Sequence, residues 1–365
     1  MKKTAFICDE SYFWHDSGTG ALFLPAGGYV QVEGSSESPE SKRRFKNLME
    51  KSGLYKRLQL IEPYPATVEQ INYFHTMEHI NHVKELSNGN GGESGILANV
   101  GRGSYEIALL SAGGAITAVE AVVKGVCKNA YVLTRPPGHH AEKDRGNGYC
   151  IFNNAVIAAM YARKELGIER IMVLDWDVHH GNGTEDAFYD DSNVLFISVH
   201  QEGLYPINRG EADQIGEGNG KGYNINIPLP GATGDAGYIY AFEQIIRPAA
   251  NRFKPELIIV SAGQDASMFD PLARMMVSSD GFRQMTKIVR EVAETNCGGK
   301  LVALHEGGYS TAYVPFCSHA IVEELSGENM DVEDPFIGAF SGTPYKVLSN
   351  HQKERVDNIK KLHSL

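Results

Sequence analysis

Short apolar runs rich in β-branched residues alternate with longer amphipathic stretches along the whole chain. The short runs predict strands at 4–8, 130–134, 171–174, 194–199, 257–261 and 301–305. Apolar positions at helical spacing predict helices over 41–52, 105–124, 154–165, 234–251, 279–295 and 311–325. Regular alternation of strand and helix is typical of a parallel sheet covered by helices, so we expect a single α/β domain over residues 1–365.

Two segments lie outside this alternation. Residues 16–39 hold Gly and Ser with scattered Leu, Phe, Tyr and Val. A loop this long inside a compact domain is usually functional or disordered, and its apolar residues favour an ordered loop packed on another surface. Residues 326–365 follow the last predicted helix and form a C-terminal extension.

Composition and charge narrow the class of protein. Hydrophobic residues make up 42% and charged residues 22% of the chain, which is ordinary for a globular enzyme, and we expect no membrane-spanning run. The net charge of −11 argues against nucleic-acid binding and favours cationic ligands. Five cysteines without a CxxC pair fit unpaired thiols in a reducing, cytoplasmic setting.

Polar motifs follow four of the predicted strands. They cover residues 135–140, 175–183, 262–265 and 305–309. The carboxyl ends of parallel strands share one edge of a sheet, and ligands bind there. We therefore expect the four motifs to converge on one site.

The motif Asp175–Gly183 carries two acids and two histidines, more than a helix cap requires. If the strand alternation continues through it, Asp175, Asp177 and His179 project from one face, as the ligands of a divalent metal would. Asp177 and His179 with the distant Asp265 supply three ligands and leave a position for water, which is the layout of a catalytic zinc site.

Two other motifs offer proton transfer and charge stabilisation. The tandem His139-His140 offers a base for water and an acid for a leaving amine. Tyr309, on a Gly-Gly turn, offers a phenolic donor to a developing oxyanion. Together with a metal, these groups predict hydrolysis of an amide.

These motifs, with Gly148-Tyr149-Cys150 and Asp270-Pro271, resemble the histone deacetylase superfamily. The chain is most similar to the class II-like bacterial amidohydrolases, in a superfamily that includes the acetylpolyamine amidohydrolases. The resemblance runs from the first strand to about Leu325. It implies an arginase-deacetylase-like fold, an open parallel sheet flanked by helices in one domain.

The resemblance assigns roles to the residues of the motifs. It implies zinc bound by Asp177, His179 and Asp265. His140 would be the general base and then the acid for the amine, with His139 as its electrostatic partner.

Further residues support these groups. Asp175 would fix the tautomer of His139. Asn182 stands where some relatives carry an Asp beside the second histidine, so the pKa of His140 is raised less than a carboxylate would raise it. Tyr309 would polarise the acetyl oxygen, which leaves His180 as a structural residue.

The resemblance also implies a narrow substrate tunnel and two potassium sites. The tunnel residues are Gly148, Tyr149, Leu204, Tyr205 and Leu272. The residues that match the first potassium site are Asp175, Asp177, His179, Ser198 and Val199. The residues that match the second are Phe188, Asp191, Val194 and Tyr223.

Two departures from the family pattern concern the surroundings of the site. Gln264 precedes the third metal ligand where many relatives have Phe, and Ser38-Pro39-Glu40 is the nearest match to an early His-Pro-Glu segment. In relatives this early loop shapes the entrance and the oligomer contacts. We therefore expect a homo-oligomer, a dimer or tetramer, in which residues 16–39 narrow the tunnel.

The sequence therefore predicts a zinc-dependent deacetylase of N-acetylated primary amines, either small acetylated diamines and polyamines or acetyl-lysine. The acidic charge and the long loop favour small cationic substrates. Leu272 opposes a dedicated polyamine enzyme, because a polyamine-selective branch carries Glu there. A two-metal ureohydrolase would want another acid where Ser267 stands, and a catalytically inactive binding module would not need the complete set of polar groups.

Overall fold

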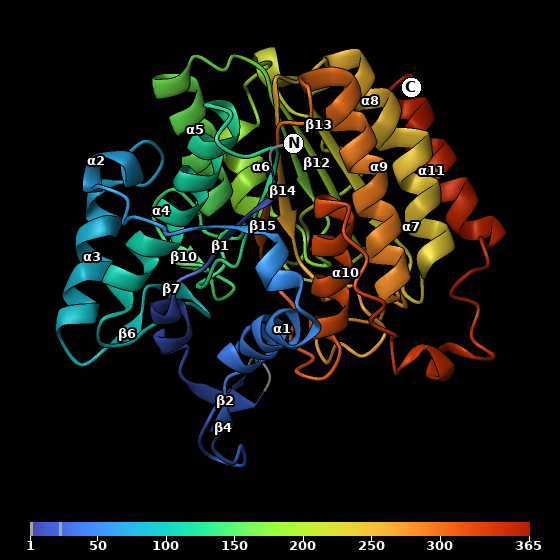
Figure 1. The fold of residues 1–365 in the computed structure, drawn as a ribbon. Helices are drawn as coiled ribbons and strands as arrows, with labels where there is room; N and C mark the ends of the chain where they lie inside the picture. The colour runs from blue at the N-terminus through green and yellow to red at the C-terminus, as the bar shows by residue number, and fades with distance from the viewer. Residues whose placement is uncertain (1–2, 22–23) are drawn as a thin grey trace.

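A computed structural model describes residues 3–21 and 24–365 of the chain. Its centre is an eight-stranded, wholly parallel sheet with the strand order β13-β12-β11-β14-β15-β9-β1-β5 (Figure 1). The strands are β1 (Ala5–Ile7), β5 (Gln59–Ile61), β9 (Ala130–Val132), β11 (Ile171–Asp175), β12 (Val194–Gln201), β13 (Asn224–Leu229), β14 (Leu257–Ala262) and β15 (Leu301–His305). This architecture confirms the predicted fold class.

All six predicted strands are present, and the two that the sequence pattern missed lie at the edges of the sheet. β5 has only three residues, and β13 reads Asn-Ile-Asn-Ile-Pro-Leu, so neither shows an unbroken apolar run. Edge strands pair on one side only, which permits such short or polar sequences.

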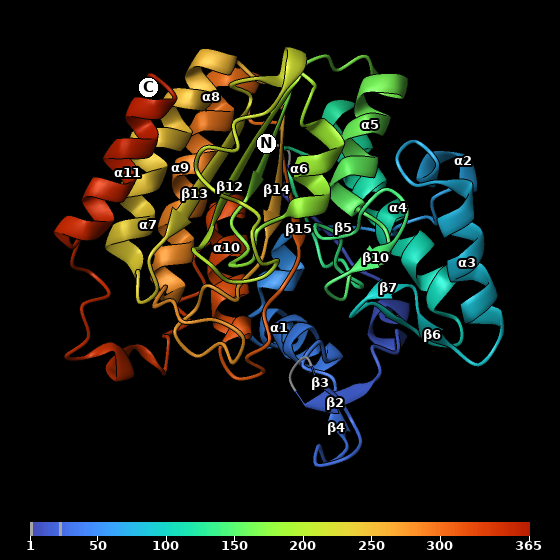
Figure 2. The same ribbon diagram turned by 180° about the vertical axis from the view of Figure 1, so that it is seen from behind.

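Two layers of helices cover the sheet. The first contains α1 (Pro39–Ser52), α7 (Asp235–Ala241), α8 (Arg247–Phe253), α9 (Ser279–Cys297), α10 (Val314–Ser326) and α11 (Asn350–Leu362). The second contains α4 (Ser104–Val123), α5 (Asn154–Leu166) and α6 (Asn182–Phe188), with α2 (Val68–Ile71) and α3 (Met77–Asn88) outside them. Figure 2 shows α7 to α11 gathered at one side of the molecule and α2 to α5 at the other.

Alternate residues of the central strands separate the two apolar cores. Met172 and Leu174 of β11 belong to the cluster beneath the first layer, whereas Ile171 and Val173 belong to the cluster beneath the second. A strand buried on both faces is apolar at every position, which is why β11 appears in the sequence as a continuous apolar run.

The predicted helix over 234–251 is interrupted. A π-helical turn, Phe242–Ile246, separates α7 from α8. Pro248 at the start of α8 has no N–H and its ring crowds the carbonyl four residues earlier, so one wider turn accommodates it. The remaining short helical segments are 3₁₀ turns at Glu10–Trp14, Leu54–Arg57, Gly218–Gly220 and Ile337–Phe340.

Residues 16–39 contain a small antiparallel sheet of β2 (Thr19–Ala21), β3 (Leu24–Pro25) and β4 (Glu33–Gly34), which projects from the body of the molecule (Figure 1). Leu22 and Phe23 lie outside the described residues. The expected packing of its apolar side chains is not seen at the tip, where Leu24, Tyr29 and Val32 are exposed. Two further ribbons pair β6 (Gly92–Glu93) with β8 (Asn99–Val100) and β7 (Gly95–Ile96) with β10 (Gly146–Asn147).

The C-terminal extension ends in a helix that the apolar pattern did not predict. In α11 a capping box joins Ser349 and Gln352, and the helix packs on α7 and β13.

The helix α4 corrects the expectation that no stretch of the chain could span a membrane, because it is long and apolar enough to cross one. Since 72% of that stretch is buried in the fold, its composition is that of a helix enclosed on most sides.

Candidate metal centre and active site

The four polar motifs meet at the carboxyl edge of the sheet. They follow β9, β11, β14 and β15, which are neighbours in the sheet although they are far apart in the sequence. The expected alternation does not continue through the second motif, because β11 ends at Asp175. Instead, the chain folds over its own carboxylates: Asp177 N donates to Asp175 Oδ1 at 3.0 Å, and His179 N donates to Asp177 Oδ1 at 3.0 Å.

Asp177, His179 and Asp265 form a compact, buried group of possible metal ligands. One ligand atom from each lies within 4.8 Å of the others. His179 Nδ1 is 3.2 Å from Asp177 Oδ1 and 3.0 Å from Asp265 Oδ2. Burial and the adjacent Asp177 raise the pKa of Asp265 to about 8, which reflects the cost of crowding two carboxylates together. A divalent cation at their centre would remove that repulsion.

The other carboxylate oxygens are held by backbone amides. Val178 N donates to Asp265 Oδ1 at 2.8 Å, and Gly307 N donates to Asp177 Oδ2 at 2.8 Å. A Cβ at Gly307 would collide with Asp265 Oδ2. The Gly-Gly turn therefore lets the backbone approach the ligands closely enough to fix their orientation.

The two histidines of the first motif lie against this group. Their ring centroids are 3.9 Å apart, and His139 Nδ1 lies 2.9 Å from Asp175 Oδ2. Burial disfavours a charge on His139, but Asp177 and Asp175 outweigh it and raise its pKa to about 10. Burial and the cationic His139 hold the pKa of His140 well below its usual range. The two environments therefore move the pKa values of the histidines apart, so that His139 is the charged partner and His140 the neutral base.

The tautomer of His140 follows from a short chain of hydrogen bonds. Asn182 Nδ2 donates to Glu142 Oε1 at 3.2 Å, which turns Asn182 Oδ1 toward His140. That oxygen lies 2.9 Å from His140 Nδ1 and can only accept. His140 therefore carries its proton on Nδ1, and Nε2 has the free lone pair.

A cavity of about 550 Å³ opens above these groups. Its lining residues are Leu97, His140, Gly148, Tyr149, His179, Gly203, Leu204, Tyr205, Ile207, Pro271, Leu272, Arg274 and Tyr309. The structure thus brings all five predicted tunnel residues to one cavity. Tyr149 has a φ of 67°, an uncommon backbone conformation for a side chain of this size. The Tyr205 ring stands edge-on to His140, 5.1 Å away between centroids.

Tyr309 forms part of the inner wall of the cavity. Its backbone N–H donates to Asp270 Oδ2 at 2.8 Å, and its ring centroid is 6.4 Å from that of His179. Burial and the nearby Asp265 raise the pKa of its phenol well above the usual value. The hydroxyl therefore keeps its proton and can donate a hydrogen bond.

The residues predicted for potassium fall into two places, one beside the site and one at the amino end of β12, at the other edge of the sheet. Asp175 and Ser198 are register partners on β11 and β12. In the second set, the carbonyls of Phe188, Asp191 and Tyr223 accept backbone hydrogen bonds from Asp191, Val194 and Phe196, at 3.1, 3.4 and 2.9 Å. His180, expected to be structural, has Nε2 3.1 Å from Glu185 Oε2.

The early segment of the chain holds a buried charge cluster. Glu37 forms ion pairs with Lys42 at 3.0 Å and with Arg135 at 2.9 Å, and all three side chains are fully buried. The segment matched in the sequence, Ser38-Pro39-Glu40, instead caps α1, with Ser38 at the N-cap and Pro39 as the first helical residue. Glu37, one position before Ser38, is the buried acid that the sequence analysis missed. Lys42 and Arg135 each need an acidic partner when they are buried, and this need is the signal that could have pointed to Glu37.

Two other features are weaker candidates for a site. His139, Cys150 and Glu306 also form a buried group, but Cys150 Sγ donates to Gly148 O, burial holds the thiol pKa well above its usual value, and Glu306 Oε2 accepts from Gly138 N at 2.6 Å. A protonated thiol is a poor metal ligand.

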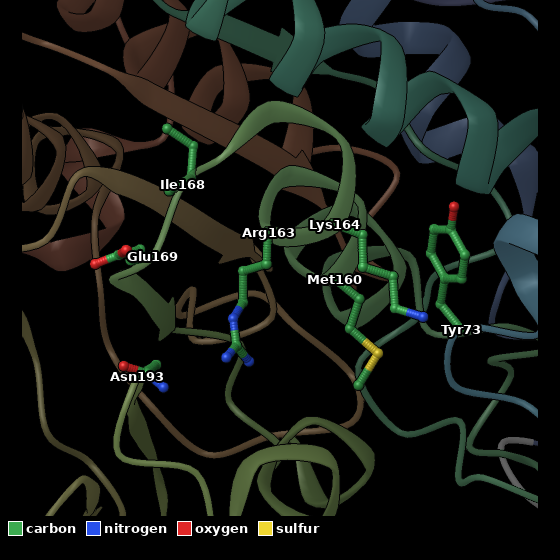
Figure 3. Close-up of a pocket in the computed structure, with 7 residues that line it drawn as sticks. All are labelled: Tyr73, Met160, Arg163, Lys164, Ile168, Glu169 and Asn193. Carbon is green, nitrogen blue, oxygen red and sulfur yellow. The ribbon is translucent and has the colours of Figure 1, made fainter.

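A hollow of about 740 Å³ lies beside the C-terminal end of α5 (Figure 3). Its two basic side chains are occupied: Arg163 pairs with Asp191, and Lys164 Nζ lies 4.2 Å from the centroid of the Tyr73 ring. The hollow is next to the amino ends of β11 and β12, at the opposite edge of the sheet from the four motifs.

Sequence and structure comparisons agree on one relationship. Residues 35–325 match the histone deacetylase domain family. A histone deacetylase-like amidohydrolase of Pseudomonas aeruginosa is 48% identical over 98% of this chain and 95% of its own length. A probable deacetylase of Archaeoglobus fulgidus is 37% identical over 95% of this chain and 98% of its own. The crystal structure of the HDA15 HD domain superposes with a TM-score of 0.86 at 30% identity, covering 99% of this chain and 94% of that one.

Proposed function

The chain belongs to the histone deacetylase family and is a deacetylase, and on that premise we propose that it is zinc-dependent and hydrolyses N-acetylated primary amines. The observation that carries the proposal is the convergence of Asp177, His179 and Asp265 beneath a cavity lined by His140 and Tyr309. The amine would belong either to a small diamine or polyamine or to lysine.

The donor set fits zinc. Two carboxylates and one imidazole are ligands that zinc accepts, and three protein ligands are typical of its catalytic sites. A zinc ion bound there supplies Lewis acidity, which polarises a carbonyl oxygen and makes water a stronger nucleophile near neutral pH.

His140 is the proposed general base. Its Nδ1 proton is held by Asn182, so Nε2 is free to take a proton from the attacking water and to return it to the leaving amine. His139, held by Asp175, would carry positive charge beside it.

Tyr309 is the proposed donor to the acetyl oxygen. Its hydroxyl keeps its proton, and negative charge grows on that oxygen as the water attacks. Asp270 fixes the backbone of Tyr309, and Ser41 of α1 donates to the carbonyl of Gly308 at 3.0 Å. The Gly-Gly-Tyr turn is thereby held from both sides.

The test is hydrolysis of an acetyl-lysine peptide and of acetylcadaverine by the zinc-loaded protein. We expect His140→Ala to lower kcat about 10²- to 10⁴-fold with unchanged zinc content. His82→Ala, at an exposed position on α3, is the matched control and should retain full activity. Full activity of the His140→Ala protein would contradict the proposal, and binding without turnover by the wild type would instead indicate a binding module.

We also propose three properties on the strength of the resemblance. Potassium ions would occupy the two sites named above, one at the carboxyl edge of the sheet and one beside the amino end of β12, and would support the loops there. The chain would form a homo-oligomer through residues 16–39, whose apolar tip residues Leu24, Tyr29 and Val32 are exposed. It would act in the cytoplasm. Light scattering on a variant in which the tip of residues 16–39 is shortened tests the oligomer. We expect the molar mass of the particle in solution to fall to that of a smaller assembly.

A further inference from the structure

The mouth of the cavity carries a positive charge. Arg274 is exposed and also lines the cavity, so it stands where the cavity meets the solvent. It follows Pro271 and Leu272, which line the same wall. A substrate whose acetyl group reaches His140 and Tyr309 would leave its far end near this residue.

The position of Arg274 is fixed by its neighbours. Its backbone N–H donates to Gln201 Oε1 at 2.8 Å, and Nη1 donates to the carbonyls of Ala273 at 2.6 Å and Pro271 at 3.4 Å. Among the described residues no carboxylate pairs with it. Nε and Nη2 therefore keep their donors for a ligand.

Among the described residues that line the cavity, no side chain carries a negative charge that would pair with a cation. In the described part of the chain, none of the lining residues is Asp or Glu. Glu202 is next to the lining residue Gly203, but its carboxylate is paired with Arg355 at 2.5 Å. The overall charge of −11 does not make the mouth of the cavity attractive to cations, because salt screens charges that lie more than about 10 Å away.

We propose that Arg274 determines substrate choice at this mouth, favouring acetylated amines whose far end is anionic or neutral over acetylated diamines and polyamines. The inference rests on the proposed deacetylase function and names its substrate class. Acetyl-lysine, with its carboxylate or peptide carbonyls at the far end, belongs to the favoured class. An acetylated diamine presents an ammonium group to the Arg274 guanidinium and is repelled.

Three substrates with the same acetamidopentyl chain test the proposal. 6-Acetamidohexanoate, 6-acetamidohexanamide and N-acetylcadaverine share the acetyl group and five methylenes and differ only in a carboxylate, amide or ammonium at the far end. Their kcat/KM values on the zinc-loaded full-length protein measure the preference. An exposed charge pair changes such a constant up to about fivefold. Attraction of the carboxylate and repulsion of the ammonium act in the same direction, so we expect kcat/KM for 6-acetamidohexanoate to exceed that for N-acetylcadaverine about tenfold.

Variants at Arg274 separate this preference from other causes. Arg274→Gln should bring the carboxylate-to-ammonium ratio close to one, and Arg274→Glu should reverse it. Lys221→Glu makes the same charge change at an exposed position just before the amino end of β13, away from the cavity, and should leave the ratio unaltered. High salt should reduce the wild-type ratio.

The outcomes distinguish the two proposals. If wild type hydrolyses the amide but prefers acetylcadaverine, or if Arg274→Glu leaves the ratio unchanged, the role of Arg274 is wrong and the deacetylase proposal stands. If wild type with zinc hydrolyses none of the three substrates nor an acetyl-lysine peptide, the proposed function itself fails.

Discussion

Replacing Glu37 by Gln tests whether the buried charge cluster stabilises the fold. The change leaves Arg135 and Lys42 inside the protein without a counter-charge, although both are fully buried. Breaking a buried ion pair by removing one partner costs about 3–5 kcal/mol of unfolding free energy. Arg135 also donates to the carbonyls of Tyr12 and His15, at 2.9 and 2.8 Å, so the loss should loosen the whole entrance segment.

The assay is urea unfolding of both proteins, supported by melting temperatures. With an unfolding entropy of about 2 cal/mol/K per residue, a loss of about 3–5 kcal/mol corresponds to a melting point about 4–7 °C lower. Glu10→Gln is the control, because Glu10 pairs with Arg43 at 2.7 Å on the surface. Its loss should lower the free energy of unfolding by less than about 0.5 kcal/mol. An equal effect of the two substitutions would refute the reasoning.

The pH dependence of this difference has a definite sign. Burial favours the neutral form of Glu37, but Arg135 and Lys42 outweigh it and lower its pKa from 4.5 to about 2. A carboxyl with a lowered pKa in the folded state contributes stability above its unfolded pKa and loses it as the pH falls toward the folded pKa. The gap between wild type and Glu37→Gln should therefore be constant above about pH 5 and shrink between about pH 4.5 and 2.

Two further substitutions test the site, and a third tests the buried contacts of α6. Tyr309→Phe should lower kcat about 10²- to 10³-fold, with an unchanged circular dichroism spectrum and zinc content, because it removes only the donor to the acetyl oxygen; normal turnover would dismiss that role. Asp265→Asn should lose zinc on dialysis against a chelator that wild type withstands, as elemental analysis would measure, and equal retention would argue against Asp265 as a ligand. Glu185→Ala removes one of the two acceptors of the Asn224 and Asn226 amides, at 2.9 and 2.7 Å, and leaves them only the carbonyls of Gln214 and Glu211. It should cost about 2–4 kcal/mol in urea unfolding, and a loss below about 1 kcal/mol would contradict that reasoning.

The central strands and the composition of the site were predictable, because a buried parallel strand has an unmistakable apolar run. Asp175, Asp177 and His179 lie side by side, but not because the strand alternation continues through them. Their convergence comes from a loop folded on its own carboxylates, which strand periodicity does not describe.

What the sequence did not reveal depends on contacts between distant segments. Glu37 is one acid among many until its burial beside Lys42 and Arg135 is known. Arg274 likewise reads as a surface residue until the fold brings it to the cavity that contains His140. In contrast, α11 had a local signal in Ser349 and Gln352 that apolar periodicity overlooked.

The strand order also has a consequence for biosynthesis. Asp177 and His179 follow β11, whereas Asp265 follows β14, and Gly307, which orients Asp177, follows β15. During translation the first two proposed ligands leave the ribosome more than 80 residues before the third. Since β14 and β15 must insert between β11 and β9, a nascent chain cannot hold the metal in its final geometry until the sheet is nearly complete. Loading of the proposed metal would thus be a late event, and a truncated chain that ends before β15 should be both metal-poor and inactive.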